Sequence, residues 1–316
     1  MAQVSTAEYR PARRGLRGIF KEMRREWTAY LWHAPGLLIF AVFVAYALYS
    51  SFVLSFQQWN ILEPEKRFVG LGNYREVLGD DTFWRSLGHT AYYMLGSVPT
   101  QMAIGLGLAV LLNSKIRGLS IFRTAYYLPV ITPIVIAAII WKWVYEVDFG
   151  LANYYLLRLG IIDKPLLWLS DPALAMPAVI VMIVWKAVGF NMIIYLAGLQ
   201  AIPNEYYEAA DVDGAGPWQR FRKITFPLVA PTTLFLLVLN MIGAMKSFEQ
   251  IFVMTQGGPP GPGGATTTVV YWIYQQAFVY FRMGYASALA YVLFALMFVL
   301  SLWMFRYYVK RVEEIR

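Results

Sequence analysis

Apolar runs of about 20 or more residues recur from one end of the chain to the other. A helix of this length can cross the hydrocarbon core of a bilayer, which is about 30 Å thick, at a rise of about 1.5 Å per residue. The chain is therefore expected to be an all-α integral membrane protein. Its second span is expected to be kinked near Pro99. The six predicted transmembrane helices are 37–56, 89–112, 124–145, 173–200, 229–254 and 284–305.

The composition agrees with a membrane location and excludes several kinds of site. Of the 316 residues, 59% are hydrophobic and 15% are charged, whereas soluble domains carry about 25% charged residues. The absence of cysteine excludes disulfides, thiolate metal sites and cysteine nucleophiles. The net charge of +8 comes mainly from Lys and Arg beside apolar runs. That placement is typical of a membrane topology signal and not of a nucleic-acid surface.

Lys and Arg are distributed unequally between the two sides that the six spans define. The two terminal segments and the second and fourth connections hold 17 of the 27 basic residues, the other connections hold 7 and the spans hold 3. Because basic residues are retained in the cytoplasm, both termini are predicted to be cytoplasmic. The predicted organisation is a basic tail at 1–34, a transmembrane domain at 35–308 and a C-terminal tail at 309–316.

The N-terminal tail carries seven basic residues between Arg10 and Arg25. The apolar run after it is too long for the core of a cleavable signal peptide, so the first span is expected to be retained as an anchor. Apolar residues at three- and four-residue steps from Ile19 to Leu31 indicate an amphipathic helix on the inner membrane surface. An unstructured basic tail is the alternative.

The predicted cytoplasmic connection at 201–228 is longer than the 2 to 8 residues or so that usually join packed helices. Asn204 is a suitable N-cap for a first short helix, which Gly214 would end. Pro217 would begin a second helix and Pro227 would stop it. The segment is expected to protrude into the cytoplasm as a docking element, and a purely structural loop is the alternative.

This connection reads EAADVDGAGPWQRFRKITFP from Glu208 to Pro227. It resembles the EAA motif of binding-protein-dependent ABC transporter permeases, which is Glu-Ala-Ala, three residues, Gly, nine residues, Ile, one residue and Leu-Pro. The matching residues are Glu208, Ala209, Ala210, Gly214, Ile224 and Pro227, and Phe226 stands where the motif has Leu. Ala209 and Ala210 are expected to leave a nearly flat surface for a partner.

The resemblance covers most of the chain from about Tyr30 onward, and it is to the sugar-permease branch related to the maltose and glycerol-3-phosphate systems. It implies the type I ABC importer permease fold. It also implies that the chain forms half of the pathway for a sugar, oligosaccharide or glycerol-phosphate-type solute across the bacterial cytoplasmic membrane. The segments that carry it are FVGLGNY at 68–74, FRTAYYLP at 122–129, FEQIFVMTQGGP at 248–259 and GYASALAYVLF at 284–294.

The resemblance further implies a second homologous permease subunit, two cytoplasmic ATPase subunits and an extracytoplasmic substrate-binding protein as partners. Glu208 would pair with a basic residue of the ATPase, Ala209 and Ala210 would pack in its cleft, and Gly214 would permit the turn. The chain has no G-x-x-x-x-G-K-[ST] phosphate loop. It is therefore not expected to be an enzyme or to hold a cofactor, and ATP and Mg²⁺ would bind to the ATPase subunits.

Charged and amide side chains within the predicted spans are costly there and are by default candidates for function. Lys142 stands between two tryptophans and is interpreted as an interfacial anchor. An ion pair between Lys246 and Glu249 on one helix is an alternative for these two residues. Sugar recognition needs hydrogen-bonding groups and aromatic faces. The residues predicted to line a pathway for a polyhydroxylated solute are Trp185, Lys186, Asn191, Asn240, Lys246, Glu249 and Gln250.

Other functions fit the residue pattern less well. His33 and His89 are the only histidines and are predicted on opposite sides of the membrane, so a metal site is not expected. An ion-coupled secondary transporter would also have six spans and buried charges, but it leaves the connection at 201–228 unexplained. A membrane-embedded enzyme would need paired carboxylates or a histidine cluster. The Gly- and Pro-rich segment at 256–268 is expected to be an irregular exposed outer loop, and the resemblance implies that it contacts the binding protein.

Overall fold

The computed structural model describes residues 27–113, 118–255 and 264–313. The described chain is helical apart from one two-stranded ribbon and short connections, which confirms the prediction of a mainly α-helical membrane protein. The chain divides after Val53 into two compact units, and each is described by itself. Most of the predicted amphipathic helix in the basic tail lies outside the described residues.

The first unit contains one long apolar helical segment. It consists of α2 (Trp27–Phe40), a π-helical turn η1 (Ala41–Ala45) and α3 (Tyr46–Leu54), whose last residue is the first of the second unit. Residues Tyr30–Leu54 are long and apolar enough to span a membrane. The helix therefore starts before the predicted span at 37–56, and the boundary that was predicted at residue 34 lies inside α2.

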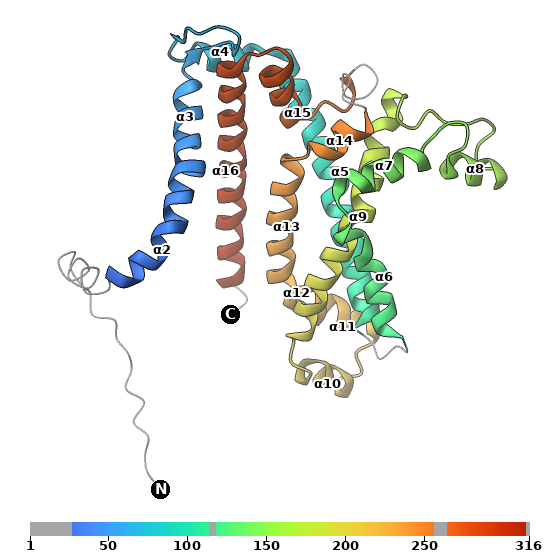
Figure 1. Ribbon diagram of the computed structural model, residues 1–316. Coiled ribbons are helices and arrows are strands. Elements are labelled where there is room, and N and C mark those ends of the chain that lie inside the picture. The colour runs from blue at the N-terminus through green and yellow to red at the C-terminus, as the bar shows by residue number, and fades with distance from the viewer. Residues whose placement is uncertain (1–26, 114–117, 256–263, 314–316) are drawn as a thin grey trace, which may run out of the picture. The chain divides into compact units, whose positions relative to one another are not determined.

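The second unit contains the other elements of the described part of the chain (Figure 1). Its ribbon pairs β1 (Gln57–Gln58) antiparallel with β2 (Arg67–Phe68). Its longest helices are α5 (Asp81–Leu112), α9 (Pro172–Gln200) and α16 (Met283–Glu313). The remaining helical elements are α4 (Gly72–Gly79), α6 (Leu119–Ile131), α7 (Ile134–Val144), α8 (Leu151–Arg158), α10 (Glu205–Val212), α11 (Pro217–Arg220), η2 (Phe221–Thr225), α12 (Phe226–Leu228), α13 (Ala230–Met245), α14 (Glu249–Met254), α15 (Val269–Tyr274) and η4 (Gln275–Val279).

α9 packs against α5, α6, α7 and α13 and is the central helix of the second unit. Glycines at its crossings allow the close approach. A Cβ atom on Gly105 of α5 would lie 2.7 Å from the Cβ atom of Asn191 on α9. A Cβ atom on Gly189 would overlap the carbonyl oxygen of Tyr126 on α6. Small residues at crossings are typical of helices in lipid, where backbone proximity and dispersion hold the bundle together.

Among the described residues, four helices are long and apolar enough to cross a membrane, and the number of candidate spans is six if each of two bent pairs is counted as one span. The predicted third span, 124–145, is broken at Thr132 and Pro133 into α6 and α7, whose axes differ by 99°. Thr132 has a ψ angle of 128°, because a following proline disfavours the α conformation. We call Thr132 and Pro133 the elbow. α5, in contrast, continues through Pro99 as one helix.

The predicted fifth span, 229–254, is also divided. A bend of 61° separates Pro217–Leu228 from α13, and α13 ends at Met245 before α14 begins at Glu249. Within the gap, Thr268 Oγ1 donates to the carbonyl of Ser247 at 3.0 Å, which replaces a lost helical bond. The threonines at 266–268 are buried. The described end of the predicted exposed loop is therefore packed inside the unit, which corrects that prediction.

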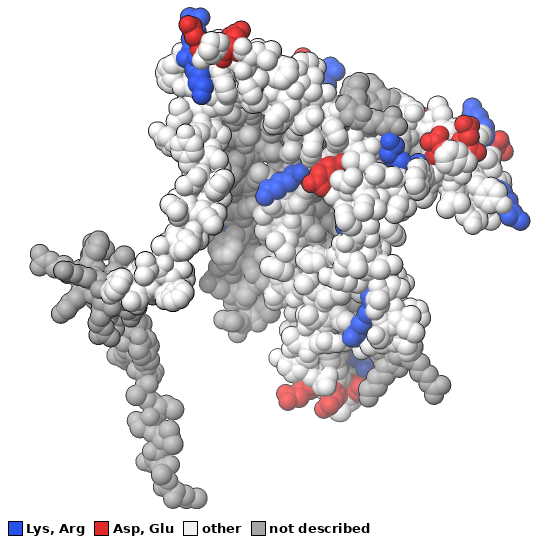
Figure 2. Space-filling model, viewed as in Figure 1, with Lys and Arg blue, Asp and Glu red and all other residues white. Residues whose placement is uncertain are grey.

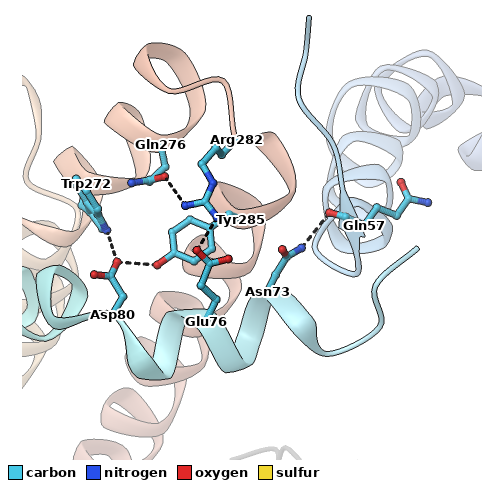
Figure 3. A network of polar contacts seen from close by, with 8 residues as sticks. All are labelled: Gln57, Asn73, Glu76, Asp80, Trp272, Gln276, Arg282 and Tyr285. Atoms are coloured by element: carbon cyan, nitrogen blue, oxygen red, sulfur yellow. Dashed lines mark hydrogen bonds and ion pairs between the residues drawn. The ribbon is translucent and has the colours of Figure 1, made fainter. Parts of the chain in front are cut away.

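A polar network joins α4, the start of α5, α15 and the start of α16 (Figure 3). Asp80 accepts bonds from Trp272 Nε1 at 2.9 Å, from Tyr285 Oη at 2.6 Å and from the backbone N–H of Thr82 at 2.8 Å. Burial raises the pKa of Asp80, but the hydrogen bonds together lower it by more than burial raises it. The pKa of Asp80 therefore lies below its ordinary value. Arg282 pairs with Glu76 at 2.5 Å. The network fixes one end of the second unit.

The opposite end of the second unit is formed by α10, α11 and the end of α16 (Figure 1). The connection at 201–228 and the C-terminal end of α16 therefore lie at the same end of this unit. This arrangement agrees with the charge distribution, which predicts that both are cytoplasmic.

Candidate functional site

A cavity of about 360 Å³ lies between α5, α7, α9, α13 and α14. We call it the polar cavity, because two stretches of the chain supply it with hydrogen-bonding groups. Its polar residues are Tyr93, Ser97 and Gln101 from α5, and Asn240, Lys246, Ser247, Glu249 and Gln250 from the α13–α14 segment. Four of the predicted pathway residues, Asn240, Lys246, Glu249 and Gln250, thus meet in one place.

The gap between α13 and α14 explains why polar groups concentrate there. Lys246 follows the last residue of α13, whereas Glu249 is the first residue of α14. Both side chains are exposed, and no ion pair joins them within the described residues. The alternative of a Lys246–Glu249 pair on one helix surface is therefore wrong, because the chain changes direction between them. Both charges are available to a molecule in the cavity.

Asn191 supports the polar cavity from behind and does not line it. It is fully buried and donates through Nδ2 to the carbonyl of Ala187 at 3.0 Å. Its Oδ1 accepts a bond from Asn240 Nδ2 at 2.7 Å. This bond orients Asn240 and leaves the Asn240 carbonyl oxygen for other partners. Gln250 is held in a similar way by its 2.8 Å bond to Tyr93 Oη.

Two further polar residues of the cavity, Gln101 and Ser247, were not among the predicted residues. Each side chain is 4% exposed. Gln101 Oε1 and Ser247 Oγ have no hydrogen-bond partner in the described part of the chain. Both residues line the polar cavity, and buried polar atoms are normally paired, so these two side chains are candidates to bind a molecule there. Gln101 is the amide within the second predicted span, and the reasoning applied to Asn191 and Asn240 could have found it.

Lys186 and Trp185 do not line the polar cavity. Lys186 Nζ donates to backbone carbonyls at the elbow. Trp185 is 40% exposed and lines a separate apolar groove of about 960 Å³. There its ring packs edge-on against Trp141, with 5.7 Å between the ring centroids. Sequence position alone assigned both residues to the pathway because it could not show which face of α9 each occupies.

The segment at 201–228, which we call the coupling loop, contains a helix, a glycine turn and a second helical stretch. α10 ends in a Schellman motif, in which Ala215 N–H donates to the carbonyl of Ala210 at 2.9 Å and Gly214 N–H to that of Asp211 at 3.1 Å. Gly214 has a φ of +71°, a conformation that glycine adopts without strain. Gly214 therefore ends the helix as its sequence position predicts.

The coupling loop is braced from within and presents acidic groups outward. Asp211 pairs with Arg220 across the turn, and Tyr207 Oη lies 3.1 Å from Thr225 Oγ1. Acidic side chains gather over α10 in Figure 2, and among them Glu208 is exposed. These internal contacts hold the loop in shape without using the Glu208 carboxylate.

Three details of the coupling loop differ from expectation. Ala209 is exposed but Ala210 is 8% exposed, so Ala210 packs within this chain and only Ala209 offers the flat surface. Asn204 precedes α10 without a side-chain cap bond. The second helix continues past Pro227 to Leu228, because the wide π turn of η2 places Pro227 in the first turn of α12, where its missing N–H is tolerated. Ile224 is half-buried.

Comparison with known proteins identifies the family of the chain. The sequence model of the family described as "binding-protein-dependent transport system inner membrane component" matches residues 101–314. The chain is 38% identical over 275 residues to the arabinooligosaccharides transport system permease protein AraP of Bacillus subtilis, covering 86% of each chain. It is 37% identical over 261 residues to the trehalose/maltose transport system permease protein MalF of Thermococcus litoralis, covering 83% of this chain and 85% of that one.

The same fold occurs in a solved structure of a bacterial alginate ABC transporter in complex with an alginate pentasaccharide-bound periplasmic protein. The TM-score is 0.77 at 24% identity, over 90% of this chain and 95% of the other. The ion-coupled alternative finds no support among these relatives. The resemblance inferred from the motifs is confirmed: the chain belongs to the binding-protein-dependent transport system inner membrane component family, as a multi-pass ABC transporter permease of the cytoplasmic membrane.

Proposed function

We propose that this chain forms half of the pathway by which an ATP-driven importer moves a sugar, an oligosaccharide or a glycerol-phosphate-type solute. The observation that carries the proposal is the polar cavity, whose lining includes Gln101, with an unpaired Oε1, and Ser247, with an unpaired Oγ. A sugar hydroxyl can donate to either oxygen once that side chain turns toward the cavity. The printed names of AraP and MalF, which refer to oligosaccharides and disaccharides, support the same class of solute.

The chemistry of the cavity suits a polyhydroxylated molecule. Lys246 can donate to sugar oxygens, and Asn240 Oδ1, Glu249, Gln101 and Ser247 can accept from sugar hydroxyls. Phe248 adds an aromatic ring to the lining, against which an apolar sugar face can pack. The volume of about 360 Å³ lies within the range of about 300 to 1,000 Å³ that is usual for small-molecule sites.

The energy for transport would come from partner subunits through the coupling loop. In this proposal, Glu208 pairs with a basic residue of a cytoplasmic ATPase subunit and Ala209 packs against it, while Gly214, Ile224 and Pro227 maintain the shape of the loop. This chain lacks a phosphate loop. In this proposal, ATP and Mg²⁺ therefore bind to two separate ATPase subunits. A second homologous permease completes the pathway, and an extracytoplasmic binding protein delivers the solute.

Asn240→Ala tests the pathway assignment. We expect about a fivefold rise in the solute concentration for half-maximal uptake, which corresponds to about 1 kcal/mol for one lost hydrogen bond. Uptake is measured in vesicles that contain the purified complex, with the sugar that its binding protein retains.

Asn191→Ala should instead act mainly on stability and lower the melting temperature, because it removes a fully buried side chain.

Gln275→Ala is the matched control, since Gln275 is an amide in η4 that is not part of the cavity lining. It should leave half-saturation unchanged. If Asn240→Ala retains the half-saturation and rate of the parent protein while ATP hydrolysis remains coupled, Asn240 does not contact the solute and the proposed pathway is wrong.

A further inference from the structure

The elbow leaves backbone carbonyls without helical partners. α6 ends at Ile131 and α7 begins at Ile134 after a bend of 99°, so the last carbonyls of α6 cannot continue the i to i−4 bonding pattern. Pro133 contributes no N–H group. Inside a membrane, such carbonyls need a donor from elsewhere in the protein.

Lys186 of α9 donates to three carbonyls at the end of α6 and the elbow, of which that of Pro129 also accepts from Thr132 N–H at 3.3 Å. Its Nζ lies 2.8 Å from the carbonyl oxygen of Thr132, 3.2 Å from that of Val130 and 3.3 Å from that of Pro129. An ammonium group has three N–H donors, and here each has an acceptor. The positive charge also lies at the negative end of the α6 helix dipole. Lys186 has no carboxylate ion-pair partner within the described residues, so the carbonyls are its main compensation.

The elbow that Lys186 holds is part of the wall of the polar cavity. Ile134, the first residue of α7, lines the cavity. Ile183 and Ala187, on either side of Lys186 in α9, line it as well. α7 also packs against α14, which carries Glu249 and Gln250. The position of the elbow therefore affects both an apolar wall of the cavity and the helix that presents two of its polar groups.

We infer that Lys186 is a positioning residue that fixes the elbow, and through it the shape of the polar cavity, without touching the solute. This inference rests on the proposed function of the cavity. A direct contact between Lys186 and an anionic solute is the competing role. It is disfavoured because binding such a solute would require the ammonium to give up backbone carbonyls that have no other side-chain donor among the described residues.

Lys186→Met tests the inference by two independent measurements on the complete complex in lipid vesicles. Because the chain has no cysteine, Ile121→Cys on α6 and Ile140→Cys on α7 can carry spin labels that report the elbow, with the complex lacking both cysteines as background. We expect a broadened distance distribution in Lys186→Met. We also expect about a fivefold rise in half-saturation for uptake of an arabinooligosaccharide, with the maximal rate and the basal ATPase activity unchanged.

Lys186→Arg keeps a cationic donor and should restore both the narrow distribution and the half-saturation. Lys142→Met removes a lysine of α7 that has no role at the elbow, and it should change neither. If Lys186→Met does not assemble, Lys186→Gln carries the same comparison with the same expected broadening. An unchanged distance distribution in the assembled variant would overturn the inference. If half-saturation rises while the distance stays the same, Lys186 contacts the solute directly, and the proposed function stands without this inference.

Discussion

Glu208→Arg is expected to reduce ATP-driven uptake about 100-fold and to prevent the ATPase subunits from co-purifying with the permease. Truncating one partner of a buried, hydrogen-bonded charge pair at a protein interface costs about 2 to 5 kcal/mol, and a like charge in its place adds repulsion. Glu208 is exposed on α10, and the contacts that brace the coupling loop do not include its carboxylate. Membrane insertion and melting temperature should therefore stay at parental values. Uptake in vesicles and affinity purification measure the two effects.

Glu205→Arg provides the matched control. Glu205 is also acidic, exposed and on α10, three residues earlier, so this variant makes the same change in net charge at a neighbouring position. It should retain most of the uptake. Equal losses in the two variants would mean that the acidic surface of α10 acts as a whole, and full activity of Glu208→Arg would remove Glu208 from the coupling contact.

Gln101→Leu should separate function from stability. Gln101 is buried and its Oε1 has no partner within the described residues. Removing an unpaired buried polar atom relieves a desolvation penalty of about 1 to 3 kcal/mol, and Leu has a similar shape. The melting temperature is therefore expected to stay the same or to rise. The solute loses a hydrogen-bond partner in a confined site, so uptake at low solute concentration is expected to fall about tenfold or more.

Gln250→Leu gives the opposite stability result and serves as the comparison. Its Nε2 donates to Tyr93 Oη, so the substitution removes a satisfied internal bond and should lower the melting temperature. Purified complexes in detergent provide the melting curves, and vesicles provide the uptake. A drop in melting temperature for Gln101→Leu together with unaltered uptake would show that the unpaired atom serves packing and not transport.

The features that could be predicted from sequence depend on local chemistry. Apolar runs indicate helices because lipid leaves the backbone few other ways to form hydrogen bonds. Gly214 could be identified as a helix end because a left-handed residue is needed there and glycine adopts that conformation readily. Asn240, Lys246, Glu249 and Gln250 could be selected because polar groups within a span are rare. These residues lie close in sequence, so one break in one helix brings them to one cavity.

The features that were missed depend on contacts between distant segments. Lys186 and Thr132 are 54 residues apart, and only the packing of α9 on α6 brings them together. Asn191 resembles a pathway residue until its bonds to Ala187 and Asn240 show that it is behind the wall. The carbonyl of Ser247, in the gap between α13 and α14, accepts a hydrogen bond from Thr268, which lies 21 residues later in the chain. A pattern along one helix contains no information on these partners.

We propose that the solute crosses through this chain at the expense of ATP hydrolysed by partner subunits. The most direct measurement is solute uptake into vesicles that contain the permease, its co-purifying permease and ATPase subunits, and the loaded binding protein. Uptake is expected only when ATP and Mg²⁺ are present on the side of the membrane that carries the ATPase subunits. It should be abolished when the ATPase subunits are omitted. Uptake driven by a proton or sodium gradient in vesicles that lack the ATPase subunits would contradict the claim.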